Sequence, residues 1–208
     1  MTKTEALKKL EEEMRSDSHL PLIEANLVFG EGDPEAEVMF TGEAPGFYED
    51  REGRPFVGQA GKLLDKLFAE IKWPRGSVYV TNIVKRRPPQ NRDPLPEEIA
   101  AYAPYLKKQI EVINPKIIVP LGRFSMNYFL PEAKISRDQG RVFRLRGKLI
   151  FPLYHPAAAL RSTTVLGALR NSFLKLPEII ARSKELIAKN NEAGSLGEKS
   201  EAPLSLFD

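Results

Sequence analysis

The chain has 208 residues, of which 42% are hydrophobic and 28% charged, the balance of a globular protein that can bury a core of ordinary size. It contains no cysteine, which excludes disulfides, thiolate zinc sites and cysteine-held iron–sulfur clusters, and no apolar run is long enough to span a membrane. The formal net charge of +3 is compatible with a phosphate-bearing partner without establishing one, and the lack of a signal-peptide pattern predicts a cytoplasmic protein.

Helices and short buried strands are predicted to alternate along the chain. Apolar spacing predicts helices over residues 4–14, 62–71, 96–113, 123–130 and 165–189. Short apolar runs predict strands over residues 37–41, 78–80 and 116–121, and a hairpin over residues 141–145 and 148–153. This order predicts an α/β fold with three layers, α/β/α, around a mostly parallel, four-stranded central sheet.

Three loops of unusual composition follow predicted strands, beginning near residues 42, 82 and 155. The carboxyl ends of parallel strands meet at one edge of a sheet, and α/β proteins bind their ligands there. We therefore expect the loops to form one site within a folded domain of residues 1–189. Residues 190–202 have the polar composition of a flexible linker, and residues 203–208 carry an apolar cluster after it.

Each loop carries a residue suited to binding a base, and each residue also has an ordinary structural explanation. Gly42 and Glu43 follow a buried strand, where a tight turn with a solvated carboxylate is common. Phe56 lies among Gly and Pro residues and would either stack on a base or cover the core. Asn82 can accept from an N–H and donate to a carbonyl oxygen on the edge of a base, or cap a turn. His155, at the same expected edge, would be catalytic or structural.

Taken in order, the segments resemble the uracil-DNA glycosylase superfamily, and most closely its family 4. The resemblance covers about residues 15–185 and is carried by Val28-Phe29-Gly30-Glu31-Gly32, Gly42-Glu43-Ala44-Pro45-Gly46 with Glu49-Asp50, Gly53-Arg54-Pro55-Phe56-Val57-Gly58, Thr81-Asn82-Ile83-Val84-Lys85, Pro88-Pro89 with Asn91-Arg92-Asp93-Pro94, and His155-Pro156-Ala157-Ala158. It implies an enzyme that flips uracil out of DNA and hydrolyses its bond to the sugar, which starts base excision repair.

The resemblance implies a role for each residue of the expected site. Phe56 would stack on the flipped uracil, and His155 would hydrogen-bond O2 as negative charge develops there. Glu43 would position the water or support the cationic sugar, with Glu49 as a further catalytic position. The implied uracil-binding residues are Gly42, Ala44, Phe56, Asn82, Asn91 and His155.

A DNA-binding surface is also implied. Leu160 or Arg161 would fill the gap that the flipped base leaves, and basic side chains would bind phosphates. A solvated basic loop is the alternative for those side chains. The implied DNA-binding residues are Lys85, Arg86, Arg87, Arg92, Leu160 and Arg161.

Family 4 enzymes usually hold a four-iron, four-sulfur cluster through four cysteines, and the matching positions here are Asp17, Leu20, Arg86 and Tyr102. We therefore expect no cofactor and no metal. Asp17 and Arg86 are expected to form an ion pair while Leu20 and Tyr102 fill the remaining volume.

A related branch links covalently to DNA through a histidine in an inserted basic loop. This chain has neither the insertion after Lys85 nor that histidine, which favours hydrolysis.

Residues 203–208 resemble the short peptide with which bacterial repair and replication proteins bind the sliding clamp, with proline in place of the usual glutamine. Leu204, Leu206 and Phe207 would enter an apolar pocket of the clamp, and the linker would keep the enzyme near DNA. An apolar segment without function, or one that docks on the domain itself, is the alternative. We expect a monomer associated with the bacterial nucleoid and no membrane partner.

Three other functions remain open at this point. The first is a glycosylase of the same fold that prefers hypoxanthine or xanthine, which a substrate panel would distinguish. The second is a non-catalytic DNA-binding module, which would not need a carboxylate, an amide and an imidazole together. The third is an α/β enzyme of small molecules, which the lack of a Gly-rich nucleotide fingerprint disfavours.

Overall fold

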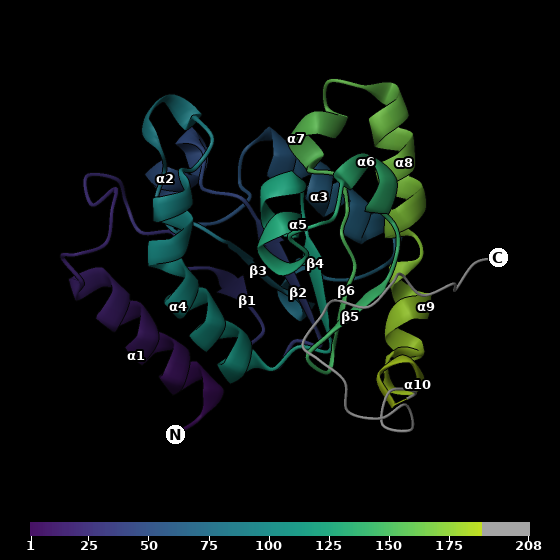
Figure 1. Cartoon of the computed structure of the whole chain (residues 1–208), viewed down its shortest axis with the longest axis horizontal. Coiled ribbons are helices and arrows are strands. Elements are labelled where there is room, and N and C mark those ends of the chain that lie inside the picture. Colours follow the sequence, from purple (N-terminus) through teal and green to yellow (C-terminus); the bar gives the residue numbers. More distant parts are fainter. Residues whose placement is uncertain (189–208) are drawn as a thin grey trace.

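The computed structural model describes residues 1–188, so the expected linker 190–202 and the peptide 203–208 lie outside the described residues. The strands are β1 (Glu31–Gly32), β2 (Val38–Gly42), β3 (Tyr79–Asn82), β4 (Ile117–Pro120), β5 (Phe143–Leu145) and β6 (Lys148–Ile150) (Figure 1). The α-helices are α1 (Lys3–Ser16), α2 (Phe47–Glu52), α3 (Gln59–Glu70), α4 (Pro96–Ile113), α5 (Arg123–Phe129), α6 (Ile135–Asp138), α7 (Pro156–Ala159), α8 (Thr163–Phe173), α9 (Leu176–Ala181) and α10 (Ser183–Ala188).

The central sheet has six strands in the order β1-β3-β2-β4-β6-β5. The four inner strands run parallel, as expected, while β1 and β5 extend the two edges as antiparallel strands. The parallel register places Gly42 of β2 opposite Asn82 of β3, and Thr41 opposite Pro120 of β4. The carboxyl ends of these three strands therefore share one edge of the sheet, which is the usual ligand position in such folds.

Helices cover both faces of the sheet and bury a separate apolar cluster on each. In β2, Phe40 faces the cluster beneath α3 and α8, whereas Met39 faces the cluster beneath α1 and α4, because successive strand residues point to opposite faces. The Phe40 ring packs on Phe68 of α3 at 5.0 Å and on Phe173 of α8 at 5.8 Å, measured between ring centroids. The predicted three-layer arrangement is confirmed, and the two layers of helices are visible in Figure 1.

One predicted helix needs correction, and the short helix α2 was not predicted. The single helix expected over residues 165–189 is three helices, α8 to α10, and Pro177 lies in the first turn of α9. Proline there lacks the N–H that would continue the preceding helix, so the chain turns between Phe173 and Leu176. The short helix α2 was not expected, because it fits between Gly46 and Gly53 and buries no side chain that would give it an apolar period. Within residues 1–188 no helix combines the length and apolarity needed to cross a membrane.

Candidate active site

A cavity of about 650 Å³ opens where β2, β3 and β4 end, a volume within the range of small-ligand sites. Its wall contains most of the residues that the sequence assigned to one site: Glu43, Ala44, Glu49, Phe56, Asn82, Asn91, Arg92, His155 and Arg161. It also contains side chains that the sequence reasoning did not assign, among them Asp93, Arg123, Ile135 and Tyr154. Asp93 lay within a segment of the family resemblance, whereas nothing in the sequence singled out Arg123.

Asn82 is buried at the floor of this cavity with only 2% of its surface exposed. Its Nδ2 finds no hydrogen-bond acceptor among the described residues. An unpaired buried amide donor costs about 1–3 kcal/mol, so such a group calls for an acceptor from a ligand. Gly42 makes the close approach possible: a Cβ there would overlap Asn82 Oδ1 and lie 2.5 Å from Phe56 Cζ. A side chain at position 42 would therefore close this part of the cavity.

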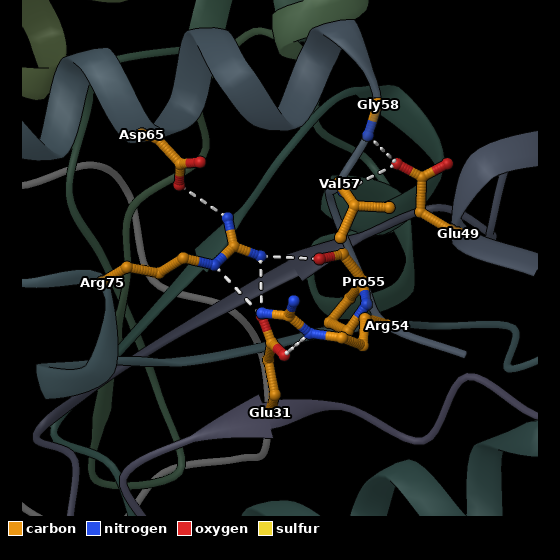
Figure 2. Close-up of polar contacts among 8 residues, drawn as sticks. All are labelled: Glu31, Glu49, Arg54, Pro55, Val57, Gly58, Asp65 and Arg75. Atoms are coloured by element: carbon orange, nitrogen blue, oxygen red, sulfur yellow. Dashed lines mark hydrogen bonds and ion pairs between the residues drawn. The ribbon is translucent and has the colours of Figure 1, made fainter. Parts of the chain in front are cut away.

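Phe56 adopts a left-handed backbone with φ of 53°, which is unusual for an aromatic residue and costs free energy. The surrounding loop holds it in place, since Glu49 Oε1 accepts from the backbone N–H of Val57 at 2.9 Å and of Gly58 at 2.8 Å (Figure 2). The ring lies nearly parallel to that of His155, with centroids 5.7 Å apart. Glu49 thus faces the cavity, but one of its carboxylate oxygens holds the loop that positions Phe56.

A second polar cluster fixes the other side of the same loop. Arg75 Nη2 donates to the carbonyl of Pro55 at 2.6 Å, and its guanidinium also contacts Asp65 at 2.7 Å and Glu31 at 3.1 Å (Figure 2). Arg54 Nε donates to Glu31 at 2.7 Å, which ties the loop to the edge strand β1. The position of Phe56 is therefore set by contacts with α2, α3 and β1 together.

His155 precedes the short helix α7, and its Nδ1 accepts from the backbone N–H of Ala157 at 3.1 Å. Burial lowers the pKa of His155 to about 4, and the charge of Glu49 opposes this only in part. The imidazole is therefore neutral near pH 7. Because Nδ1 is an acceptor, the single ring proton must reside on Nε2, which leaves that atom as a hydrogen-bond donor.

Glu43 follows directly on β2, and burial is the main cause that raises its pKa to about 7. The negative charge of Asp93 raises this pKa further, and the positive charge of Arg123 lowers it. Arg123 and Asp93 form an ion pair of 2.6 Å that joins the start of α5 to the loop before α4. A carboxyl group that ionises near neutral pH can accept a proton at the pH where the protein works.

Two of the residues expected to bind phosphates are buried, and that part of the prediction is wrong. Lys85 has no exposed surface, and its Nζ donates to Thr81 Oγ1 at 2.5 Å and to Gln109 Oε1 at 2.6 Å. Arg86 is 7% exposed, and its Nη1 donates to the carbonyls of Ile23 and Ala25. The segment after β3 runs through the interior of the molecule, so neither cation can reach a DNA backbone.

The remaining expected DNA-binding residues lie at the surface around the cavity. Arg92 is held by Glu98 through two contacts of 2.9 and 2.6 Å, which reduces its availability for a phosphate. Arg87 donates from Nε to Asn91 Oδ1 at 2.7 Å. Leu160 is 52% exposed just after α7, and Arg161 lines the cavity beside it.

The four residues expected at the positions of the family's cluster cysteines do not fit an iron–sulfur cluster. Tyr102 is fully buried and its hydroxyl donates to a backbone carbonyl at 2.7 Å, while Leu20 is 6% exposed, so both fill the interior as expected. The expected ion pair between Asp17 and Arg86 is wrong, because Asp17 Oδ2 accepts instead from the Tyr105 hydroxyl at 2.7 Å. None of the four supplies a thiolate, and residues 1–188 contain no cluster of three metal-binding side chains.

Known proteins resemble this chain over most of its length. Residues 29–176 match the uracil DNA glycosylase superfamily. The type-4 uracil-DNA glycosylase of Sulfurisphaera tokodaii is 45% identical over 194 residues, which cover 86% of this chain and 87% of the relative. The type-4 uracil-DNA glycosylase of Saccharolobus solfataricus is 46% identical over 188 residues, 85% of each chain. That of Thermotoga maritima is 40% identical over 193 residues, 90% of this chain and 98% of the relative.

Proposed function

This chain belongs to the uracil DNA glycosylase superfamily, in its type-4 branch, and from that premise we propose how its cavity performs the reaction. The activity is hydrolysis of the bond between uracil and deoxyribose in DNA, which leaves an abasic site and starts base excision repair. The observation that supports this assignment of the site best is the buried Nδ2 of Asn82, a donor without a partner among the described residues, next to an aromatic ring.

Recognition of the base begins with a flipped uracil that stacks on Phe56. Asn82 Nδ2 donates to O4, and Asn82 Oδ1 accepts from N3–H. Cytosine has an amino group at the first of these positions and an unprotonated nitrogen at the second, so it would meet a donor with a donor and an acceptor with an acceptor. Since flipping a base costs a few kcal/mol, a matched partner in the cavity also helps to hold uracil outside the stack.

In the chemical step the bond from C1′ to N1 breaks, and its electron pair leaves with the uracil. Negative charge builds on O2, and Nε2–H of the neutral His155 donates a hydrogen bond to it. The oxygen of a water molecule bonds to C1′ and its proton passes to Glu43. Glu49 takes a positioning role in this proposal, because its carboxylate holds the loop of Phe56. No step requires a metal or other cofactor.

DNA is proposed to approach the rim of the cavity where Leu160 and Arg161 lie. Leu160 is exposed and apolar, so it can enter the space that the flipped base leaves. Arg161 and Arg87 supply positive charge at the rim, while Lys85 and Arg86 take no part. The contact to DNA therefore uses fewer cations than the sequence suggested.

Replacing Asn82 with alanine tests the recognition step. We expect kcat/KM for uracil in DNA to fall about 5- to 150-fold, the loss of about 1–3 kcal/mol of hydrogen bonding. The melting temperature should stay the same or rise, because an unpaired buried donor is removed. A panel of oligonucleotides with uracil, hypoxanthine, xanthine or cytosine measures both the rate and the base preference. Faster release of hypoxanthine or xanthine than of uracil by the wild type would assign the cavity to another base.

Residues 203–208, which lie outside the described residues, support a separate proposal on sequence alone: they bind the bacterial sliding clamp through Leu204, Leu206 and Phe207. Deleting residues 203–208 is expected to abolish binding to purified clamp while the rate on a short oligonucleotide stays unchanged. Biosensor measurements on both proteins check this. Clamp binding that survives the deletion, or that the full chain also lacks, contradicts the proposal.

A further inference from the structure

An exposed pair of aromatic side chains lies next to the cavity and takes no part in the reaction described above. Phe47 and Tyr48, the first two residues of α2, are 51% and 49% exposed. Their ring centroids are 5.4 Å apart and the rings are nearly perpendicular, at 82°. Among residues 1–188 they are the aromatic members of the exposed large apolar side chains. Each ring therefore offers apolar area to a partner in solution.

An arginine lies over each of the two rings. The guanidinium carbon of Arg87 is 5.1 Å from the centroid of the Phe47 ring, and that of Arg51 is 5.3 Å from the centroid of the Tyr48 ring. We call Phe47, Tyr48, Arg51 and Arg87 the aromatic patch. Aromatic rings interleaved with arginines are typical of surfaces that bind single-stranded nucleic acid, because bases stack on the rings and cations attract the phosphates.

The aromatic patch is fixed relative to the cavity at two points. Glu49, the residue after Tyr48, accepts hydrogen bonds from the backbone of Val57 and Gly58 (Figure 2), which directly follow Phe56 in the chain. On the other flank Arg87 donates to Asn91, a residue of the cavity wall. A strand that delivers one base onto Phe56 can therefore place a neighbouring nucleotide on the aromatic patch.

The acidic residues of α2 each contact a partner within the protein. Glu49 accepts from the loop of Phe56, and Asp50 Oδ1 accepts from the backbone N–H of Asn26 at 2.7 Å. Glu52 lies 3.6 Å from Arg51. Each carboxylate is thus engaged within the protein, and the two aromatic rings remain exposed at the start of the helix.

We propose that the aromatic patch binds an unpaired nucleotide next to the flipped uracil, so that the enzyme releases uracil from single-stranded DNA more efficiently than from duplex DNA. The inference rests on the proposed function. In single-stranded DNA the neighbouring base is free to leave its own stack and pack on Phe47 or Tyr48. In a duplex that base stays paired and stacked, so it gains nothing from the patch. Stacking of a base on an aromatic side chain contributes about 1–3 kcal/mol by alanine substitution.

The test compares steady-state rates on one uracil-containing oligonucleotide, alone and annealed to its complement. The double variant Phe47→Ala, Tyr48→Ala is expected to lower kcat/KM on the single strand about 5- to 150-fold, the equivalent of about 1–3 kcal/mol, and the rate on the duplex by less than about twofold. The loss should appear mainly in KM. The double variant Phe47→Tyr, Tyr48→Phe keeps both rings, so it is expected to retain the wild-type rate on the single strand. Leu174→Ala, at another exposed apolar residue, is the matched control and should change neither rate.

Binding gives a readout that does not depend on catalysis. Fluorescence anisotropy with a single-stranded oligonucleotide that lacks uracil should show weaker binding to the alanine double variant than to the wild type. Equal affinities, or equal losses of rate on single strand and duplex, would overturn the proposal. A larger loss on the duplex would also overturn it, since it would make the rings a wedge in paired DNA. If the alanine double variant binds this oligonucleotide more weakly than the wild type does, but the wild type releases no uracil, the proposed function is wrong and the binding role of the aromatic patch is supported.

Discussion

Glu43→Gln is expected to slow uracil release by about 10²- to 10⁴-fold, the range that a positioned general base contributes. The glutamine keeps the shape of the side chain and cannot accept the proton of the attacking water. Single-turnover rates on a uracil-containing oligonucleotide measure the loss. The substitution should not lower the stability of the fold, because burial raises the pKa of Glu43 and so makes its ionised form unfavourable there. At pH 8 the melting temperature of Glu43→Gln should therefore equal or exceed that of the wild type.

The pH dependence of kcat/KM is a second test of the role of Glu43. Since the ionised carboxylate is the active form and its pKa is raised to about 7, kcat/KM of the wild type should fall as the pH drops from about 8 to 6. The pKa of His155 is lowered to about 4, so the imidazole stays neutral over this range and adds no second step. Asp93→Asn removes the negative charge that raises the pKa of Glu43, and should move the fall to lower pH. A flat profile, or one that Glu43→Gln retains, contradicts this role.

His155→Ala is expected to slow release by about 10²- to 10³-fold, the usual effect of removing one donor to a developing negative charge. The loss should lie in kcat, because the hydrogen bond to O2 strengthens only as the uracil leaves. Substrates with a better leaving group, such as 5-fluorouracil, need less stabilisation and should lose less rate. This comparison separates a chemical role from a structural one.

A structural explanation of His155 predicts a different result. The ring packs on Phe56, so alanine could act by releasing that ring. In that case 5-fluorouracil and uracil would lose rate equally, and KM would rise for both. His155→Gln offers a side-chain donor at nearly the same position and is expected to recover part of kcat. No recovery together with equal losses would contradict the proposed hydrogen bond.

The sequence was sufficient to predict the parallel sheet and the convergence of three loops at one edge. That prediction depended on β2 and β3, where buried apolar runs end at Gly42 and Asn82, because parallel register brings strand ends together. The proximity of Asn82, Phe56 and His155 followed from the topology and the family resemblance. The unpaired Nδ2 and the left-handed backbone of Phe56 could not be foreseen, since each depends on how neighbouring segments pack.

Errors arose where a charged side chain was assumed to be exposed. Lys85 and Arg86 follow a strand in a basic stretch, and nothing local indicates that buried Thr81, Gln109 and backbone carbonyls accept their hydrogen bonds. The expected pairing of Asp17 with Arg86 failed because the Tyr105 hydroxyl and the carbonyls of residues 23 and 25 are their partners instead. Contacts between segments distant in the sequence decide these cases.

The cavity is expected to release uracil from DNA with residues of this chain alone, in a sequence that contains no cysteine. The most direct measurement is uracil release from a labelled oligonucleotide by the wild type, Asn82→Ala and His155→Ala side by side, with an iron chelator present throughout. We expect the wild type to release uracil at a rate that the chelator does not change, and both variants to release it far more slowly. A folded wild type that releases no uracil, or equal release by all three proteins, would contradict it.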